Sequence, residues 1–194
     1  MRRFLLLSML GLGLTACGTT QMSMPYSPTA QPVSIGRPVV ALGTVTDRRE
    51  DGREDPNWIG TVRGGFGNPL KRLEAPVPVS EVVRQAFSDA LAARGMLATG
   101  APRYLLSVEI IQFKSDQVGR REATVEFQVT LTPAAGGAAV LQDRELANQI
   151  TGSVLTLSAG VFGSLDELRA IALSTMSQAI DRILDKPGFA AALR

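Results

Sequence analysis

The residue types that most often perform catalysis are scarce in this chain. It has no histidine and a single cysteine, Cys17, among 194 residues. That composition excludes most zinc and copper sites, histidine-assisted serine or cysteine nucleophiles, and any internal disulfide. Carboxylate pairs, lysine chemistry and oxygen-ligated magnesium remain possible. We therefore expect a protein that is not an enzyme, and a carboxylate-dependent enzyme is the less favoured alternative.

An acidic stretch between residues 47 and 55 holds the densest group of possible metal ligands. Its carboxylates are Asp47, Glu50, Asp51, Glu54 and Asp55. They do not follow the alternating spacing of a calcium-binding loop, and arginines are interleaved with them. We interpret the stretch as a solvated, salt-bridged loop rather than a cation site or an acid–base pair.

A glycine-rich stretch, GGFG at residues 64–67, is followed by Asn68 and Lys71 and could be imagined to hold a phosphate. It matches neither the dinucleotide fingerprint nor the phosphate-loop motif, and it does not lead from a strong strand into a helix. The stretch is more typical of a turn that glycine permits.

Four apolar side chains are candidates for contact with a protein partner: Trp58, Phe66, Ile111 and Phe113. If the loop that holds the glycine turn is exposed, Trp58 and Phe66 would be aromatic anchors for a partner, because aromatic residues dominate contact hot spots. Packing in the core is the alternative for Trp58. Ile111 and Phe113 lie on the strand face opposite to Leu106, so they form either an exposed binding patch or a surface that the domain's own loops cover.

The chain begins with a short positive stretch and an apolar run. Arg2 and Arg3 precede residues 4–14, which are apolar apart from one serine and two glycines. A membrane-spanning helix needs ~20 apolar residues, which is about twice this length. The pattern predicts a signal peptide over residues 1–16 rather than a transmembrane anchor.

The residues that close this segment, Leu14-Thr15-Ala16-Cys17, resemble the lipobox of bacterial lipoproteins. Leu14 is the branched apolar residue of that motif, and the small side chains of Thr15 and Ala16 suit a signal peptidase that must approach the backbone closely. The resemblance implies cleavage before Cys17 and a diacylglyceryl thioether on its sulfur. Two or three acyl chains would hold the protein firmly on a membrane. We expect this covalent lipid on Cys17, no other cofactor and no metal.

Gly18 follows the cysteine. In enteric bacteria an aspartate at this position is the familiar signal for retention in the inner membrane. Gly18 therefore favours the periplasmic face of the outer membrane, and the inner membrane is the less favoured alternative.

The net charge argues against nucleic acid as a partner. Lys and Arg number 20 and Asp and Glu number 18, which gives a sequence pI of about 9.0. Cleavage before Cys17 removes Arg2 and Arg3 and so leaves 18 basic residues against 18 acidic ones. A neutral protein lacks the basic surface that binds phosphate backbones. The expected partners are a membrane, through the lipid, and an envelope protein.

Residues 18–36 carry no charge and are rich in Thr, Ser and Pro. This composition predicts that the lipidated cysteine and the residues up to 36 form a disordered tether. Such a tether would span roughly 25 Å as a flexible coil and up to about 60 Å if extended.

Hydrophobic periodicity from residue 37 onwards predicts one α+β domain, residues 37–187, followed by a short C-terminal tail, residues 188–194. The strands are expected at residues 38–46, 103–114, 122–132 and 139–150, with an irregular hairpin or long loop at 57–76. Two amphipathic helices are expected, one starting at Val79 with Ser80 as its cap and closing at Gly95, the other between a Ser164–Glu167 capping box and Pro187. We expect two layers, a mainly antiparallel sheet of about four strands with both helices packed on one face. The apolar stretch 154–162 has no clear period and is either core or exposed.

Three short motifs resemble the YajG-like group of lipoproteins of unknown function. They are VTDRR at residues 45–49, IG at 59–60 and AARGM at 92–96. The resemblance covers most of residues 37 to about 132. It implies an α+β fold and an outer-membrane lipoprotein, and it brings no catalytic residues.

The leading hypothesis is a membrane-tethered periplasmic module that binds an envelope component or has a structural role there. The first alternative is an accessory lipoprotein of a lipid or solute transport system, which would need an apolar groove between the sheet and the helices. The second is the carboxylate-dependent enzyme, which would need a deep pocket with two convergent acids.

Overall fold

The computed structural model describes residues 19–29, 31–32, 38–152 and 164–194. The lipobox, Cys17 and the apolar stretch 154–162 therefore lie outside the described residues. In chain order the elements are β1 (Thr19–Gln21), β2 (Val40–Asp47), α1 (Asp51–Glu54), β3 (Trp58–Arg63), β4 (Pro69–Glu74), α2 (Val79–Ala93), β5 (Tyr104–Val118), β6 (Arg120–Pro133), β7 (Leu141–Thr151), α3 (Leu165–Leu184) and α4 (Pro187–Ala192).

The seven strands of the described residues form one open, mixed sheet. Six of them follow the order β1-β4-β3-β5-β6-β7, and β2 pairs with β5 outside that order. β5 is long enough to pair with two parallel strands along one edge, β2 beside its first half and β3 beside its last residues. The α+β class is confirmed, but the expectation of about four strands and two helices is wrong. The sheet gains its extra strands from parallel pairings between distant segments, which local sequence patterns do not reveal.

Strands β5 and β6 form the central hairpin that alternation predicts. Gly119 joins them with a positive φ of 74°, a conformation that glycine adopts without strain. The alternating apolar residues of β6 are all buried, namely Ala123, Val125, Phe127, Val129 and Leu131. This face carries the core, and the opposite face of β6 carries the polar residues.

A β-bulge interrupts β5 between Ile110 and Gln112. The extra residue, Ile111, shifts the alternation by one position, so Phe113 faces the same side as Ile110. Phe113 is accordingly in the core at 1% exposure, whereas Ile111 is half-buried. The expectation that Ile111 and Phe113 share the face opposite to Leu106 is wrong because it assumed an unbroken strand.

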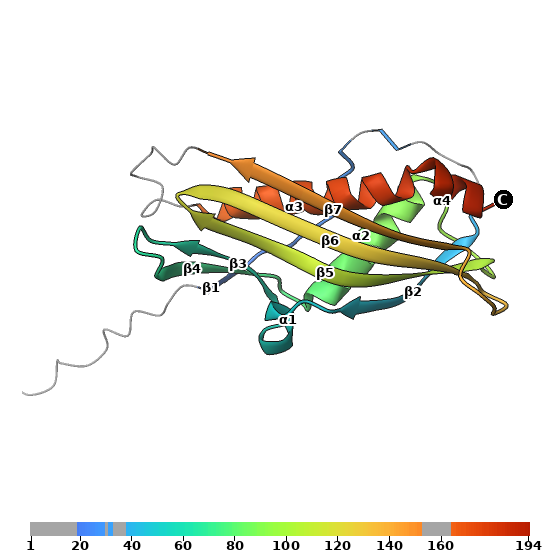
Figure 1. Cartoon of the computed structure of the whole chain (residues 1–194), viewed down its shortest axis with the longest axis horizontal. Helices are drawn as coiled ribbons and strands as arrows, with labels where there is room; N and C mark the ends of the chain where they lie inside the picture. The colour runs from blue at the N-terminus through green and yellow to red at the C-terminus, as the bar shows by residue number, and fades with distance from the viewer. Residues whose placement is uncertain (1–18, 30, 33–37, 153–163) are drawn as a thin grey trace, which may run out of the picture.

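Helices α2 and α3 lie together on the apolar face of the sheet (Figure 1). The predicted stripe of α2 is buried throughout: Val79, Val82, Val83, Ala86, Phe87, Ala90 and Leu91. Phe87 meets Phe127 of β6 edge to face, with ring centroids 5.4 Å apart. Gly95 closes α2 with a φ of 65°, and the helix begins at Val79 as predicted. Ser80 is not its cap, because Ser80 lies inside the helix and Pro78 holds the N-cap position.

The second predicted helix is confirmed as α3. The Ser164 side chain accepts a hydrogen bond from the Glu167 backbone N–H, as the capping box predicts. Beyond α3, however, the residues expected to form a tail belong to the fold. Pro187 ends one helix and starts α4, which buries Phe189, and Leu193 behind it is also buried. None of the helices in the described ranges is long and apolar enough to cross a membrane.

Candidate functional site

The N-terminal segment, defined here as residues 19–29, is the part of the described chain nearest to Cys17. We expected it to belong to a disordered tether, and for these residues the expectation is wrong. Residues 19–21 form β1, which pairs in parallel with β4 so that Thr19 lies opposite Arg72. The Met22 N–H donates to the Glu74 carbonyl at 3.0 Å, and Met24 is 6% exposed within the core cluster.

From Ser23 onwards the N-terminal segment runs along α3. Arg169 donates to the Ser23 carbonyl at 2.6 Å near the start of the helix, and the Thr29 N–H donates to Asp181 at 2.7 Å near its end. Six extended residues rise about 20 Å, and twelve helical residues rise about 18 Å. The two lengths match, so the segment can follow the helix and contact it at both ends.

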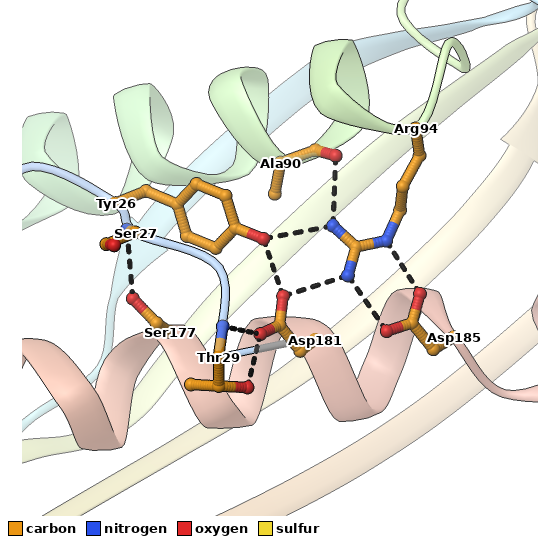
Figure 2. Close-up of polar contacts among 8 residues, drawn as sticks. All are labelled: Tyr26, Ser27, Thr29, Ala90, Arg94, Ser177, Asp181 and Asp185. Carbon is orange, nitrogen blue, oxygen red and sulfur yellow. Dashed lines mark hydrogen bonds and ion pairs between the residues drawn. The ribbon is translucent and has the colours of Figure 1, made fainter. Parts of the chain in front are cut away.

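The cluster that holds the N-terminal segment to α2 and α3 is centred on Arg94, the C-cap residue of α2 (Figure 2). Its Nε and one Nη2 hydrogen donate to Asp185 at 2.7 and 2.9 Å. The other Nη2 hydrogen donates to Asp181 at 2.8 Å. Nη1 donates to the Tyr26 hydroxyl at 3.0 Å and to the Ala90 carbonyl at 3.1 Å. All five guanidinium hydrogens thus have an acceptor, as a side chain that is only 1% exposed requires.

Asp181 is the acceptor that joins the N-terminal segment to this arginine. Its Oδ1 accepts from the Tyr26 hydroxyl at 2.5 Å and from Arg94. Its Oδ2 accepts from the backbone N–H and the hydroxyl of Thr29, at 2.7 and 2.6 Å. Nearby, the Ser27 N–H donates to the Ser177 hydroxyl at 3.2 Å. Each carboxylate oxygen has two donors, so Asp181 uses its full accepting capacity.

These contacts shift the pKa values of the groups involved. Burial alone would raise the pKa of Asp181, but the hydrogen bonds from Thr29, Tyr26 and Arg94 outweigh it and hold that pKa below its usual value. Burial, with the hydrogen bond to Asp181, raises the pKa of Tyr26 to about 12. Burial works against the charge of Arg94, but its acceptors Asp185, Tyr26 and Asp181 raise the arginine pKa further. At neutral pH Asp181 and Arg94 are therefore charged, and the Tyr26 phenol is neutral.

Such a cluster is suited to fastening a segment rather than to proton transfer. Both carboxylates are bound to one arginine, and the lowered pKa of Asp181 makes it a poor base or acid near neutral pH. This site was not predicted from the sequence. One signal was available, because Ser177, Asp181 and Leu184 follow the spacing of a single helical face that is otherwise apolar.

Arg49 organises the acidic stretch in the same manner. It is 3% exposed and forms a two-pronged ion pair with Asp47 at 2.7–3.1 Å. Its remaining hydrogens reach the carbonyls of Pro56, Trp58 and Phe113, which tie the loop after β2 to β3 and β5. The loop is thus salt-bridged, with a short helix at Asp51–Glu54. In the described ranges no three acidic or cysteine side chains converge as a metal site would require.

The structure does not bring the four candidate partner-binding side chains together on one surface. Trp58 is 9% exposed, and its indole N–H donates to the Thr61 hydroxyl at 3.2 Å. Phe113 is in the core and Ile111 is half-buried. Phe66 alone is fully exposed, at the turn between β3 and β4. Leu14, Thr15, Ala16 and Cys17 lie outside the described residues.

Comparison with models of known protein families gave no match, and comparison with curated protein sequences gave none either. The resemblance to the YajG-like group is therefore not confirmed.

Solved structures do show the fold. The crystal structure of protein XCC0632 from Xanthomonas campestris, of the family with the model DUF330, aligns over 91% of this chain and 98% of its own, with 15% identity and a TM-score of 0.62. A lipoprotein of Caulobacter crescentus aligns over 59% of this chain and 82% of its own, with 20% identity and a TM-score of 0.42. Lipoprotein GNA1162 of Neisseria meningitidis aligns over 80% and 100%, with 10% identity and a TM-score of 0.30. The last two are too distant to support an argument, and the first establishes a shared fold.

Proposed function

We propose that this chain is an outer-membrane lipoprotein, anchored on the periplasmic side by lipid on Cys17, whose domain is a non-enzymatic binding or structural module of the envelope. The observation that carries the proposal is the course of the N-terminal segment. Only Gly18 separates Cys17 from β1, and β1 is hydrogen-bonded to the edge of the sheet. A lipid on Cys17 would hold the domain against the bilayer instead of at the end of a long tether.

The contacts of Arg94 support this arrangement mechanically. A membrane anchor loads the chain at its N-terminus, and two attachment sites resist that load. One is the strand pairing of β1 with β4, and the other is the cluster of Tyr26 and Thr29 with Asp181. Fixing the segment at both sites transmits the position of the lipid to the whole domain.

Membership of the YajG-like group is part of the proposal, and the structure gives its three short motifs a physical role. The first contains Arg49 with its buried ion pair to Asp47. The second contains Gly60, where a Cβ would lie 1.6 Å from the Ser115 carbonyl oxygen. The third contains Arg94 at the end of α2. Each motif marks a position that the fold requires, which is typical of a shared scaffold and not of a shared reaction.

The two alternatives find less support. Two acids do converge, Asp181 and Asp185, but both are hydrogen-bonded to Arg94, so they do not offer an acid–base pair. A transport accessory protein would need an apolar groove between sheet and helices. In the described part of the chain, side chains such as Phe87 and Phe127 fill that space.

The anchor is tested with Cys17→Ala in the full-length chain. We expect an unprocessed or soluble product, while the wild type floats with membranes and its N-terminal peptide carries the mass of a diacylglyceryl group. A Cys17→Ala variant that still matures and fractionates with membranes would contradict the proposal.

In an enteric host, Gly18→Asp should move the lipidated protein from the outer to the inner membrane fraction. An unchanged distribution would argue against the outer-membrane assignment.

The binding role is tested by crosslinking the lipidated protein in cells. An unrelated lipoprotein of similar abundance serves as the control. We expect at least one envelope protein to be enriched with this chain alone. Recovery of the same abundant envelope proteins at the same levels in both samples would refute a specific partner.

A further inference from the structure

The hairpin tip, residues 64–70, holds the most exposed large apolar side chain of the described residues, Phe66. It joins β3 to β4 and is closed by hydrogen bonds from the Gly64 N–H to the Asn68 carbonyl at 2.8 Å and from the Gly67 N–H to the Gly64 carbonyl at 2.9 Å. Phe66 is 102% exposed at its apex, and Leu70 behind it is 39% exposed. The turn is therefore well formed, yet it presents a large aromatic side chain to the surroundings, where apolar area is unfavourable in water.

The register of β1 limits how far Cys17 can lie from this tip. β1 and β4 run in the same direction, with Thr19 opposite Arg72. Cys17 precedes Thr19 by two residues and so lies within about 7 Å of it. Phe66 precedes Arg72 by six residues and so lies within about 20 Å of that residue. The tip projects at the same end of the sheet as β1 (Figure 1). A bilayer that holds acyl chains on Cys17 is thus within reach of Phe66.

The charge of the hairpin fits a lipid surface. Arg63 precedes the tip and Lys71 follows it, and residues 64–70 carry no acidic side chain. Arg72, further along β4, is ion-paired with Asp55 and Glu74 and adds no net charge for a lipid surface. Basic side chains beside an inserted aromatic ring contact phosphate groups while their methylene stems follow the apolar part of the interface. Aromatic residues favour the headgroup region of a bilayer.

We propose that the hairpin tip is a second membrane contact, in which Phe66 and Leu70 enter the headgroup region of the bilayer that holds the lipid of Cys17. This inference rests on the proposed lipidation. The acyl chains supply the affinity, and the tip sets the orientation, so that the long axis of β5 and β6 points away from the membrane and the β6–β7 turn is directed into the periplasm.

The experiment uses the mature lipidated chain, reconstituted in vesicles of phosphatidylethanolamine and phosphatidylglycerol. The sulfur of Cys17 is blocked by its thioether, so a new cysteine is the single reactive thiol. Phe66→Cys is labelled with an environment-sensitive fluorophore. Val140→Cys, exposed at the opposite end of the sheet in the β6–β7 turn, is the matched control.

We expect the label at residue 66 to shift its emission to shorter wavelength and to lose intensity when phospholipids carry a nitroxide quencher, while the label at residue 140 does neither. Equal spectra and no lipid quenching at residue 66, in a chain that floats with the vesicles, would overturn this inference and leave the anchor intact. Shielding at residue 66 that follows protein density and not the quencher would also overturn it, because the tip would then contact a second copy. A chain that carries no lipid and does not float would overturn the anchor and the tip contact together.

Discussion

Replacing Asp181 with asparagine tests whether the cluster around Arg94 fastens the N-terminal segment. The substitution keeps the size of the side chain but removes the charge and turns one acceptor into a donor. In the wild type one carboxylate oxygen accepts from Tyr26 and Arg94, and the other accepts from Thr29 twice. Whichever way the new amide is oriented, its NH₂ group faces two donors.

The expected loss follows from burial. Breaking a buried ion pair by removing one partner costs about 3–5 kcal/mol, because the remaining charge is left uncompensated. Arg94 keeps its two bonds to Asp185, so we place Asp181→Asn near the lower value, at about 3 kcal/mol. Asp185→Asn is the matched control. Its side chain is 38% exposed, and water can replace the lost contact, so its cost should be about 1 kcal/mol.

The free energy of unfolding is measured by urea titration of the mature chain in detergent, followed through Trp58, the one tryptophan. Release of the N-terminal segment is measured separately by chymotrypsin cleavage after Tyr26, which should quicken in Asp181→Asn before global unfolding. Equal losses for Asp181→Asn and Asp185→Asn, with Tyr26 equally protected in both, would refute the reasoning.

The same carboxylate predicts an acid limit. The pKa of Asp181 is lowered in the folded state from its ordinary 3.8. The folded protein therefore gains stability from this ionised group above about pH 4 and loses it as the pH falls through the lowered pKa. Asp181→Asn should flatten the fall in stability below pH 4, which urea titrations at a series of pH values will measure. An unchanged acid profile would contradict this contribution.

Tyr26→Phe should cost about 1 kcal/mol for the lost hydroxyl contacts. The pKa of Tyr26 is raised to about 12 in the folded state, so the wild type should also lose stability between pH 10 and 12, and Tyr26→Phe should not. Phe113→Ala should cost about 3–5 kcal/mol in urea titrations, since the bulge places it in the core. Phe66→Ala, the exposed counterpart, should stay within ~0.5 kcal/mol, and similar losses for both would refute the assigned faces. Gly60→Ala should cost roughly 2–3 kcal/mol. The reason is that its Cβ would lie 1.6 Å from the Ser115 carbonyl oxygen and would force β3 away from β5. A stable variant with intact hydrogen-exchange protection of β3 would contradict the register.

Features that depend on local pattern could be predicted from the sequence. The alternation of β6, the apolar stripe of α2 and the capping box of α3 are properties of neighbouring residues, and the structure confirms each of them. The parallel pairings of β2 and β3 with β5 could not be predicted, because they join segments that share no local signal. The bulge at Ile111 is of the same kind: one inserted residue reverses the faces of everything after it.

The N-terminal segment shows why composition misjudged order at the candidate site. Low charge and abundant Ser, Thr and Pro predict disorder because such a peptide buries little apolar area by itself. Here the segment contributes hydroxyl and backbone donors, and α2 and α3 contribute the charges that need them. The segment becomes ordered only when its donors meet these charged groups. Local composition cannot reveal this, because residues 26 and 181 are far apart in the sequence.

A buried arginine with two aspartates is a costly way to hold a peptide if affinity alone is required, since apolar packing of the same volume is often as stable. Its advantage here is that it fixes the register of the N-terminal segment along α3. Asp181 has two acceptor positions left after Arg94 and Tyr26 are satisfied, and Thr29 fills them with its N–H and its hydroxyl. A segment shifted by one residue would turn its side chains to the other face and leave that oxygen buried without a donor, which is strongly unfavourable. Since β1 fixes the same segment beside β4, the cluster specifies where the chain leaves the domain in the direction of Cys17. Under the proposed lipidation, it therefore specifies which end of the sheet lies nearest to the membrane.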